Sequence, residues 1–145
     1  MARIKIELPV IIIAEIQLRV RIGDINYGNH VGNSAFVALI HEARVQWLQQ
    51  NNYTELDIEG TGLIMSDLAF EFKNEAFYGE EICIRISAGE ILKVSFELYY
   101  EMFTHRQGKV VALAKAKTGM VCYDYNLKKM TSLPEVLKAI LQLSL

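Results

Sequence analysis

A short stretch near the N-terminus concentrates side chains that can carry out acid–base chemistry. Within ten positions it holds one carboxylate, one imidazole and three amides, namely Asp24, Asn26, Asn29, His30 and Asn33. Carboxylates and imidazoles can transfer protons, and an asparagine amide can orient a water or donate to a carbonyl. Gly28 and Gly32 lie among them and allow backbone to approach a ligand closely. A polar cluster of this kind is typical of a loop that binds a ligand or carries out catalysis.

The elements around this loop are predicted to hold it in place. From Glu15 to Ile22, polar and apolar residues alternate strictly, which predicts a half-buried strand. The run from Ser34 to Gln50 contains no glycine or proline and predicts a helix, with Asn33 or Ser34 as its N-cap. A helix N-terminus presents unpaired N–H groups and favours developing negative charge. The loop and the helix start together suggest chemistry on a carbonyl group.

Glu42 lies within the predicted helix, about 12 Å along the axis from Ser34 at 1.5 Å per residue. The turns from Ala35 to Ile40 are apolar on every side, so we expect a buried helix with a sheet wrapped around it. Small residues precede Glu42 on one helix face and leave room for a ligand. A buried glutamate must be paired or protonated.

Each candidate residue also has a structural interpretation. Asp24 can close the strand by bonding its own loop, Asn26 can be a turn residue, and His30 can be an ordinary hydrogen-bonded side chain. Glu42 can pair with an arginine and hold the helix to the sheet. Only their combination and order favour a functional site.

The remainder of the chain predicts consecutive strands and a closing helix. Strand-like runs cover 63–73, 82–86, 92–102 and 109–124, with turns at Gly89-Glu90 and at 105–108. The Gly-first pair 89–90 suits a type II′ hairpin. A capping-box spacing from Ser132 to Glu135 predicts a helix that ends near Leu143. The fold class is therefore α+β, with five or six antiparallel strands curled around one long helix.

Composition narrows the functional classes. The 145 residues fit a single domain, 1–145, and the 52% apolar content suggests buried subunit interfaces. The net charge is −2 and the charges are mixed, which gives no reason to expect nucleic acid. No apolar run reaches the length of about 18 residues that a membrane span needs. Cys83 and Cys122 stand apart and are interpreted as core thiols of a reducing cytoplasm. We find no metal-ligand spacing and no nucleotide-cofactor motif, so no metal and no cofactor is expected.

The segment 19–48 resembles the hotdog-fold acyl-CoA thioesterases of the 4-hydroxybenzoyl-CoA thioesterase-like superfamily. Members typically show Asp-x-Asp at a strand end, a Gly and often a His, an Asn-Asn pair, and a helix with Glu-Ala-Arg. The corresponding residues are Asp24-Ile25-Asn26, Gly28, His30-Val31-Gly32-Asn33 and Glu42-Ala43-Arg44. A looser match extends over nearly the whole chain. The clear departure is Asn26, which stands where the best-known members carry a catalytic aspartate.

The resemblance implies hydrolysis of an acyl-CoA or acyl-carrier thioester. It assigns catalytic roles to Asp24, Asn26, His30 and Glu42, with either His30 or Glu42 as the base. Substrate and oxyanion binding falls to Gly28, Gly32, Asn33 and Ser34. It also implies a homodimer or homotetramer with the site at the dimer interface. The alternatives are a hotdog hydratase and a non-catalytic acyl-CoA-binding protein, for which Asn26 is the best argument.

Overall fold

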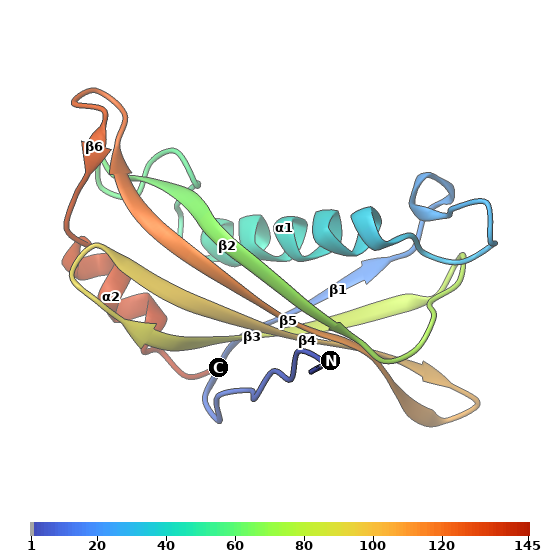
Figure 1. The fold of residues 1–145 in the computed structure, drawn as a ribbon. Coiled ribbons are helices and arrows are strands. Elements are labelled where there is room, and N and C mark those ends of the chain that lie inside the picture. The colour runs from blue at the N-terminus through green and yellow to red at the C-terminus, as the bar shows by residue number, and fades with distance from the viewer. Residues whose placement is uncertain (1) are drawn as a thin grey trace.

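A computed structural model describes residues 2–145 as one antiparallel sheet with a long helix against it (Figure 1). The elements in chain order are β1 (Ile12–Arg19), the short 3-10 helix η1 (Ile22–Asp24), α1 (Asn33–Gln50), β2 (Gly62–Phe72), β3 (Glu81–Ile91), β4 (Ser95–Arg106), β5 (Lys109–Asp124), β6 (Lys129–Met130) and α2 (Glu135–Leu141). The strand order is β1-β3-β4-β5-β2, with β6 paired to β5. This confirms the α+β prediction, and β5 has the predicted bounds.

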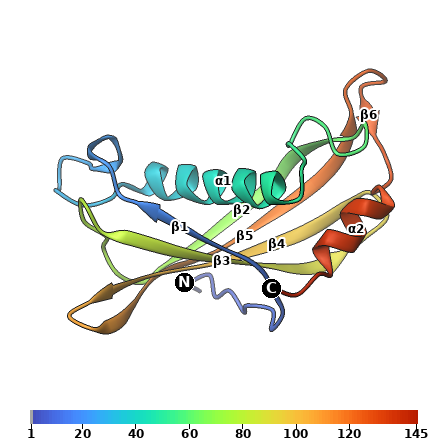
Figure 2. The same cartoon turned by 180° about the vertical axis from the view of Figure 1, so that it is seen from behind.

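The sheet is strongly twisted, and α1 lies across its concave face (Figures 1 and 2). Register shifts that mark bulges or irregularities interrupt the pairing of β2 with β5, of β3 with β4 and of β4 with β5. Bulges increase local twist, which explains how the strands curve around the helix. α2 lies beside the turn that joins β3 and β4, where the backbone N–H of Leu133 donates to the Lys93 carbonyl at 3.0 Å.

The core lies between α1 and the concave face of the sheet. From the helix it takes mainly large apolar side chains, of which Trp47 is 1% exposed and Leu48 is fully buried. From the strands it takes alternate residues such as Ile84, Leu98 and Ala116. Burying an apolar side chain of this size contributes about 1.5–3 kcal/mol, so this face fixes the helix on the sheet.

The opposite face of α1 is exposed in the single chain, which corrects the prediction of a helix buried on every side. Ser34, Ala38, His41 and Glu42 are all exposed. The physical reason is that one sheet covers only one face of a helix. Glu42 therefore has no need of a buried partner.

Four local predictions were wrong in detail. β1 runs from Ile12 to Arg19 rather than from Glu15 to Ile22. The pair 89–90 lies within β3, at the register shift between Ala88 and Ile91, and the turn follows at 92–95, closed by a 2.8 Å bond from Leu92 N–H to the Ser95 carbonyl. The N-caps of α1 and α2 are Gly32 and Pro134, and neither makes a side-chain cap bond. The backbone path, rather than a cap residue, sets these helix starts.

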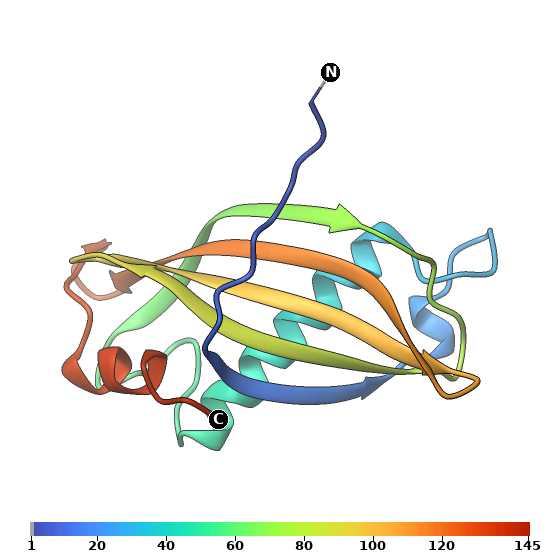
Figure 3. The same cartoon turned by 90° about the horizontal axis from the view of Figure 1, so that it is seen from below.

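The outer, convex face of the sheet is crossed by the N-terminal segment (Figure 3). Ile6 in this segment is 7% exposed, and its N–H donates to Glu71 Oε1 at 3.0 Å. None of the helices within residues 2–145 combines the length and the apolar character that a membrane crossing requires.

Candidate active site

The loop between β1 and α1 is folded tightly on itself. Ile25 and Val31 form an antiparallel bridge, and the Asn26 N–H donates to the His30 carbonyl at 2.9 Å. Asn29 has a φ of 66°, a left-handed conformation that asparagine tolerates better than most residues. The Val31 N–H donates to the Ala76 carbonyl at 2.8 Å, which anchors the loop to the segment after β2. The polar residues of the loop are thus held in defined positions.

Asp24 closes this loop from within. Its carboxylate Oδ2 accepts the Arg21 N–H at 2.8 Å, and the residue is only 9% exposed. Its carbonyl oxygen accepts the Gly32 N–H at 3.1 Å, which ties the strand end to the start of α1. These contacts agree with the structural interpretation of Asp24 and place it beneath the helix start.

Asn26, Gly28 and His30 come together at the loop tip. Asn26 Oδ1 accepts the Gly28 N–H at 2.9 Å. A Cβ atom built on Gly28 would lie 3.2 Å from both Asn26 Oδ1 and His30 Nε2, so a larger residue would crowd both side chains. His30 Nδ1 lies 3.2 Å from the Val31 carbonyl, and its Nε2 lies 3.8 Å from Glu75 Oε1. Glu75 was not predicted, because it lies 45 positions further along the chain.

The N-terminus of α1 opens beside this loop. Gly32 is the N-cap, and the Phe36 N–H donates to its carbonyl at 3.1 Å. The N–H groups of Asn33, Ser34 and Ala35 precede this bond and have no partner within the helix. With the helix dipole they can polarise a carbonyl oxygen and stabilise an oxyanion.

Glu42 and Asp24 line a groove between α1 and β1 that holds about 770 Å³. Glu42 is exposed there and accepts a hydrogen bond from Gln46 Nε2 at 2.8 Å. Ala38 supplies the small side chain that the sequence predicted in front of Glu42. Neither Asn26 nor His30 lines this groove, so the structure separates the predicted catalytic residues into two pairs.

A second groove, which holds about 220 Å³, lies on the other flank of α1, against β2. Ser34, Val37, Ala38, His41 and Met65 contribute to its wall. His41 Nε2 lies 2.6 Å from Glu55 Oε1, so an imidazole faces this groove with a carboxylate behind it. No sequence pattern indicates this pair, because Glu55 lies in the irregular segment 51–61.

A buried hydrogen-bond network supports Glu55. Arg44 Nε donates to Glu55 Oε2 at 2.7 Å, and Arg44 Nη1 donates to the Tyr100 hydroxyl at 3.0 Å. The Tyr100 hydroxyl also pairs with Thr118 Oγ1 at 2.8 Å. Burial alone raises the pKa of Glu55, but the bonds from Arg44 and His41 outweigh it and lower that pKa below its usual value. Glu55 is therefore an ionised, fixed carboxylate.

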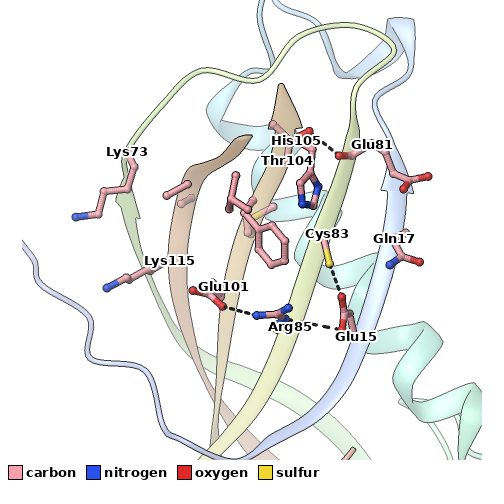
Figure 4. A pocket seen from close by; sticks show the side chains of 15 residues that line it. Glu15, Gln17, Lys73, Glu81, Cys83, Arg85, Glu101, Thr104, His105 and Lys115 are labelled. Atoms are coloured by element: carbon pink, nitrogen blue, oxygen red, sulfur yellow. Dashed lines mark hydrogen bonds and ion pairs between the residues drawn. The ribbon is translucent and has the colours of Figure 1, made fainter. Parts of the chain in front are cut away.

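A cavity of about 390 Å³ lies on the outer face of the sheet, away from every predicted site residue (Figure 4). Arg85 stands between Glu15 and Glu101, at 3.7 and 3.8 Å, with its guanidinium 4.8 Å from the centre of the Phe103 ring. The Cys83 thiol donates to Glu15 Oε1 at 2.9 Å. Burial, together with Glu15, raises the pKa of Cys83 to about 12, so this thiol is not an activated nucleophile. Among residues 2–145, no cluster of His, Cys, Asp and Glu side chains forms a metal site.

This fold and this loop-to-helix site define a class of small hotdog domains. Residues 20–141 match the model of the thioesterase-like superfamily, and the chain belongs to that superfamily. No protein of curated function matches the chain.

Solved structures of named thioesterases have the same fold. The 1,4-dihydroxy-2-naphthoyl-CoA thioesterase from Synechocystis aligns with a TM-score of 0.78 and 20% identity, over 88% of this chain and 93% of that one. A gentisyl-coenzyme A thioesterase aligns with a TM-score of 0.75 and 19% identity, over 88% of this chain and 99% of that one. The Dynemicin thioesterase aligns with a TM-score of 0.79 and 14% identity, over 88% of this chain and 93% of that one. These similarities confirm the predicted hotdog fold.

Proposed function

We propose that this protein hydrolyses the thioester of an acyl-CoA or acyl-carrier substrate. Membership of the thioesterase-like superfamily supports thioester hydrolysis in general. The observation that carries the proposal is the uncapped N-terminus of α1 beside the loop tip of Asn26 and His30. It combines oxyanion donors with groups that can position water, which are the two requirements of acyl transfer.

In this scheme the thioester oxygen binds at the backbone N–H groups of Asn33 and Ser34, with Gly28 and Gly32 leaving room for the substrate. Asn26 orients the attacking water but cannot accept its proton as a base, because an amide is not basic. His30 or Glu42 takes that proton. The new C–O bond forms, the C–S bond breaks, and the proton passes to the thiolate of the leaving group.

The proposal does not specify the acyl group of the substrate, and the structural relatives guide the choice of substrates to assay. Two of them are named for aromatic CoA thioesters. We therefore propose that aromatic acyl-CoAs be compared with straight-chain ones of graded length. A thiol-release assay with both series tests the function. Failure to cleave any thioester of CoA or of an acyl carrier would refute it.

We also propose that the active unit is a homodimer, alone or paired into a tetramer, with its sites at the interface. β2 is the last strand of the sheet order, so one of its edges is unpaired in the single chain. Its exposed apolar side chains are Ile64, Met65, Leu68 and Phe72. An unpaired apolar strand edge tends to find a partner strand, and β2 of a second copy would also cover the exposed face of α1. Light scattering at micromolar concentration should give the mass of a dimer or tetramer. Leu68→Asp should weaken this association. A wild-type monomer would contradict the proposal.

A second candidate function is acyl-CoA binding without hydrolysis, and Asn26 favours it because the usual catalytic carboxylate is missing. A protein that binds an acyl-CoA in calorimetry but releases no thiol would establish it. Either function is consistent with a cytoplasmic location, which we propose because Cys83 and Cys122 are both free and buried.

A further inference from the structure

We infer that His41, oriented by Glu55, is the general base that activates water for this reaction, in preference to His30 or Glu42. The inference rests on the proposed thioester hydrolysis and names the residue that removes the proton. It depends on three observations: the contact between His41 and Glu55, the network that fixes Glu55, and the position of His41 below the start of α1.

Among residues 2–145, only one nitrogen of the His41 ring has a hydrogen-bond partner. Its Nε2 lies 2.6 Å from Glu55 Oε1, slightly below the range of about 2.7–2.9 Å that is typical of a charge-assisted bond. A carboxylate can only accept, so Nε2 carries a hydrogen and Nδ1 of the neutral ring keeps its lone pair. A nearby carboxylate that selects the tautomer and holds the ring is the usual support of a histidine base.

Glu55 is itself fixed from the other side. Arg44, which is 5% exposed, binds the second carboxylate oxygen and is held by Tyr100. The backbone carbonyl of Glu55 also accepts the Leu63 N–H at 2.7 Å, at the start of β2. The imidazole is therefore attached to the buried core through two consecutive side-chain contacts, whereas its own side chain is 56% exposed.

His41 lies on the same line of α1 as Ser34, one of the two proposed oxyanion donors. Ser34 and His41 are seven residues apart, which at 3.6 residues per turn is about 20° short of two full turns and about 10.5 Å along the axis. Helical side chains tilt towards the N-terminus, which brings the His41 ring closer to the start of α1. Ser34 and His41 line the same groove.

The alternatives fit this geometry less well. Glu42 is about 80° away from Ser34 around the helix and lines the other groove, where neither Asn33 nor Ser34 contributes. His30 has one nitrogen against the Val31 carbonyl and the other near Glu75, and it belongs to a loop rather than to the helix. A base on a rigid helix keeps its distance from the oxyanion donors.

The proposed step balances without a cofactor. His41 Nδ1 takes a proton from water as the water oxygen bonds to the thioester carbon. The tetrahedral intermediate collapses, the C–S bond breaks, and the imidazolium returns the proton to the departing thiolate. The products are one carboxylic acid and one thiol.

The test is steady-state thioester hydrolysis by His41→Gln, a replacement at a side chain that is 56% exposed. Loss of a general base lowers turnover by about 10²–10⁴-fold, and we expect that loss in kcat with KM little changed. His105→Gln is the matched control, since it makes the same replacement at an exposed histidine in the outer cavity. It should keep full activity. In His41→Ala, added imidazole should restore part of kcat, as it would not if His41 only supported the structure.

Glu55 is tested as a positioning residue. Glu55→Gln should lower kcat more than it raises KM, and nitrogen NMR should show that the His41 ring no longer keeps its hydrogen on Nε2. An unchanged tautomer in this variant would contradict the orienting role.

The outcomes separate this inference from the proposed function. If the wild type cleaves thioesters and His41→Gln does so equally well, the function stands and the inference fails. If the wild type cleaves none, the function fails, and the hydrolysis-resistant ketone analogue acetonyl-CoA decides about His41. Binding of that analogue should shift the His41 ring signals in NMR. Analogue binding without such a shift, or no binding at all, would overturn the inference.

Discussion

Replacing Arg44 tests how α1 is held on the sheet. Arg44→Met keeps most of the aliphatic stem, which packs in the core, and removes the guanidinium group. The change deletes a 2.7 Å contact to Glu55 and a 3.0 Å contact to the Tyr100 hydroxyl. Tyr100 keeps its bond to Thr118. The main loss therefore falls on the Glu55 carboxylate.

The size of the effect follows from the burial of the two partners. Removing one partner of a fully buried ion pair costs about 3–5 kcal/mol, because the remaining charge has no partner. Arg44 is buried, but the Glu55 side chain is 21% exposed and keeps its bond to His41. Partial solvation reduces the penalty, so we expect Arg44→Met to lower the free energy of unfolding by about 2–4 kcal/mol.

Urea unfolding, followed by the fluorescence of Trp47, measures this loss. Trp47 is the only tryptophan and is 1% exposed, so its signal reports the core. Protein concentration must be equal for all variants, because association of the chain would add to its stability. The double variant Arg44→Met/Glu55→Gln should lose less stability than the sum of the two single variants. The difference, which is the coupling energy of the two residues, should be about 1–2 kcal/mol. Lys138→Met is the control, since it removes a surface pair worth at most about 1 kcal/mol.

Two results would refute this reasoning. One is a loss below about 1 kcal/mol for Arg44→Met, the range expected of an exposed pair. The other is strict additivity in the double variant, which would show that Arg44 and Glu55 do not depend on each other.

Three further predictions concern pH, thiols and activity. Hydrogen bonds from Arg106 lower the pKa of Glu80. This pair should therefore stabilise the fold above the ordinary glutamate pKa of about 4.3, and the stabilisation should be lost as the pH falls through the lowered value. Arg106→Gln should make the free energy of unfolding in urea depend less on pH in this acid range. Burial raises the pKa of Cys83 to about 12 and of Cys122 to about 11, so both should react with a thiol reagent at pH 8 only as fast as the chain unfolds; rapid labelling of the native protein would contradict this. Asn26→Asp should preserve or raise thioester cleavage, because the family resemblance implies a catalytic aspartate at this position. A steep loss in the thiol-release assay would show that the amide itself is required.

Regular elements could be predicted from the sequence because their signals are local. The run without glycine or proline gave α1 to within one residue, and β5 has the predicted bounds. The Gly89-Glu90 pair shows the limit of such signals. Its composition suits a tight turn, but pairing with β4 continues on both sides and the register shift accommodates these two residues. A tertiary contact therefore overrides a local preference.

The site was only partly predictable for a related reason. Helical periodicity shows which residues of α1 share a face, but it cannot show which face the sheet covers. Glu42 therefore lies on the exposed side, although the apolar turns before it suggested burial. The contact between His41 and Glu55 joins the helix to an irregular segment, 14 positions apart, where no spacing rule applies.

The exposed face of α1 gives the proposed dimer a functional reason. Oxyanion stabilisation is strong only where water is largely excluded, yet both grooves beside α1 are open in the single chain. The inner face of the helix is already used by the core, so the sheet of the same chain cannot cover the site as well. A second copy that pairs along β2 would cover the groove of Ser34 and His41 first, because Met65 of that strand forms its wall. Activity should then depend on protein concentration in the range where the dimer dissociates, and Leu68→Asp should lower thioester cleavage and association together.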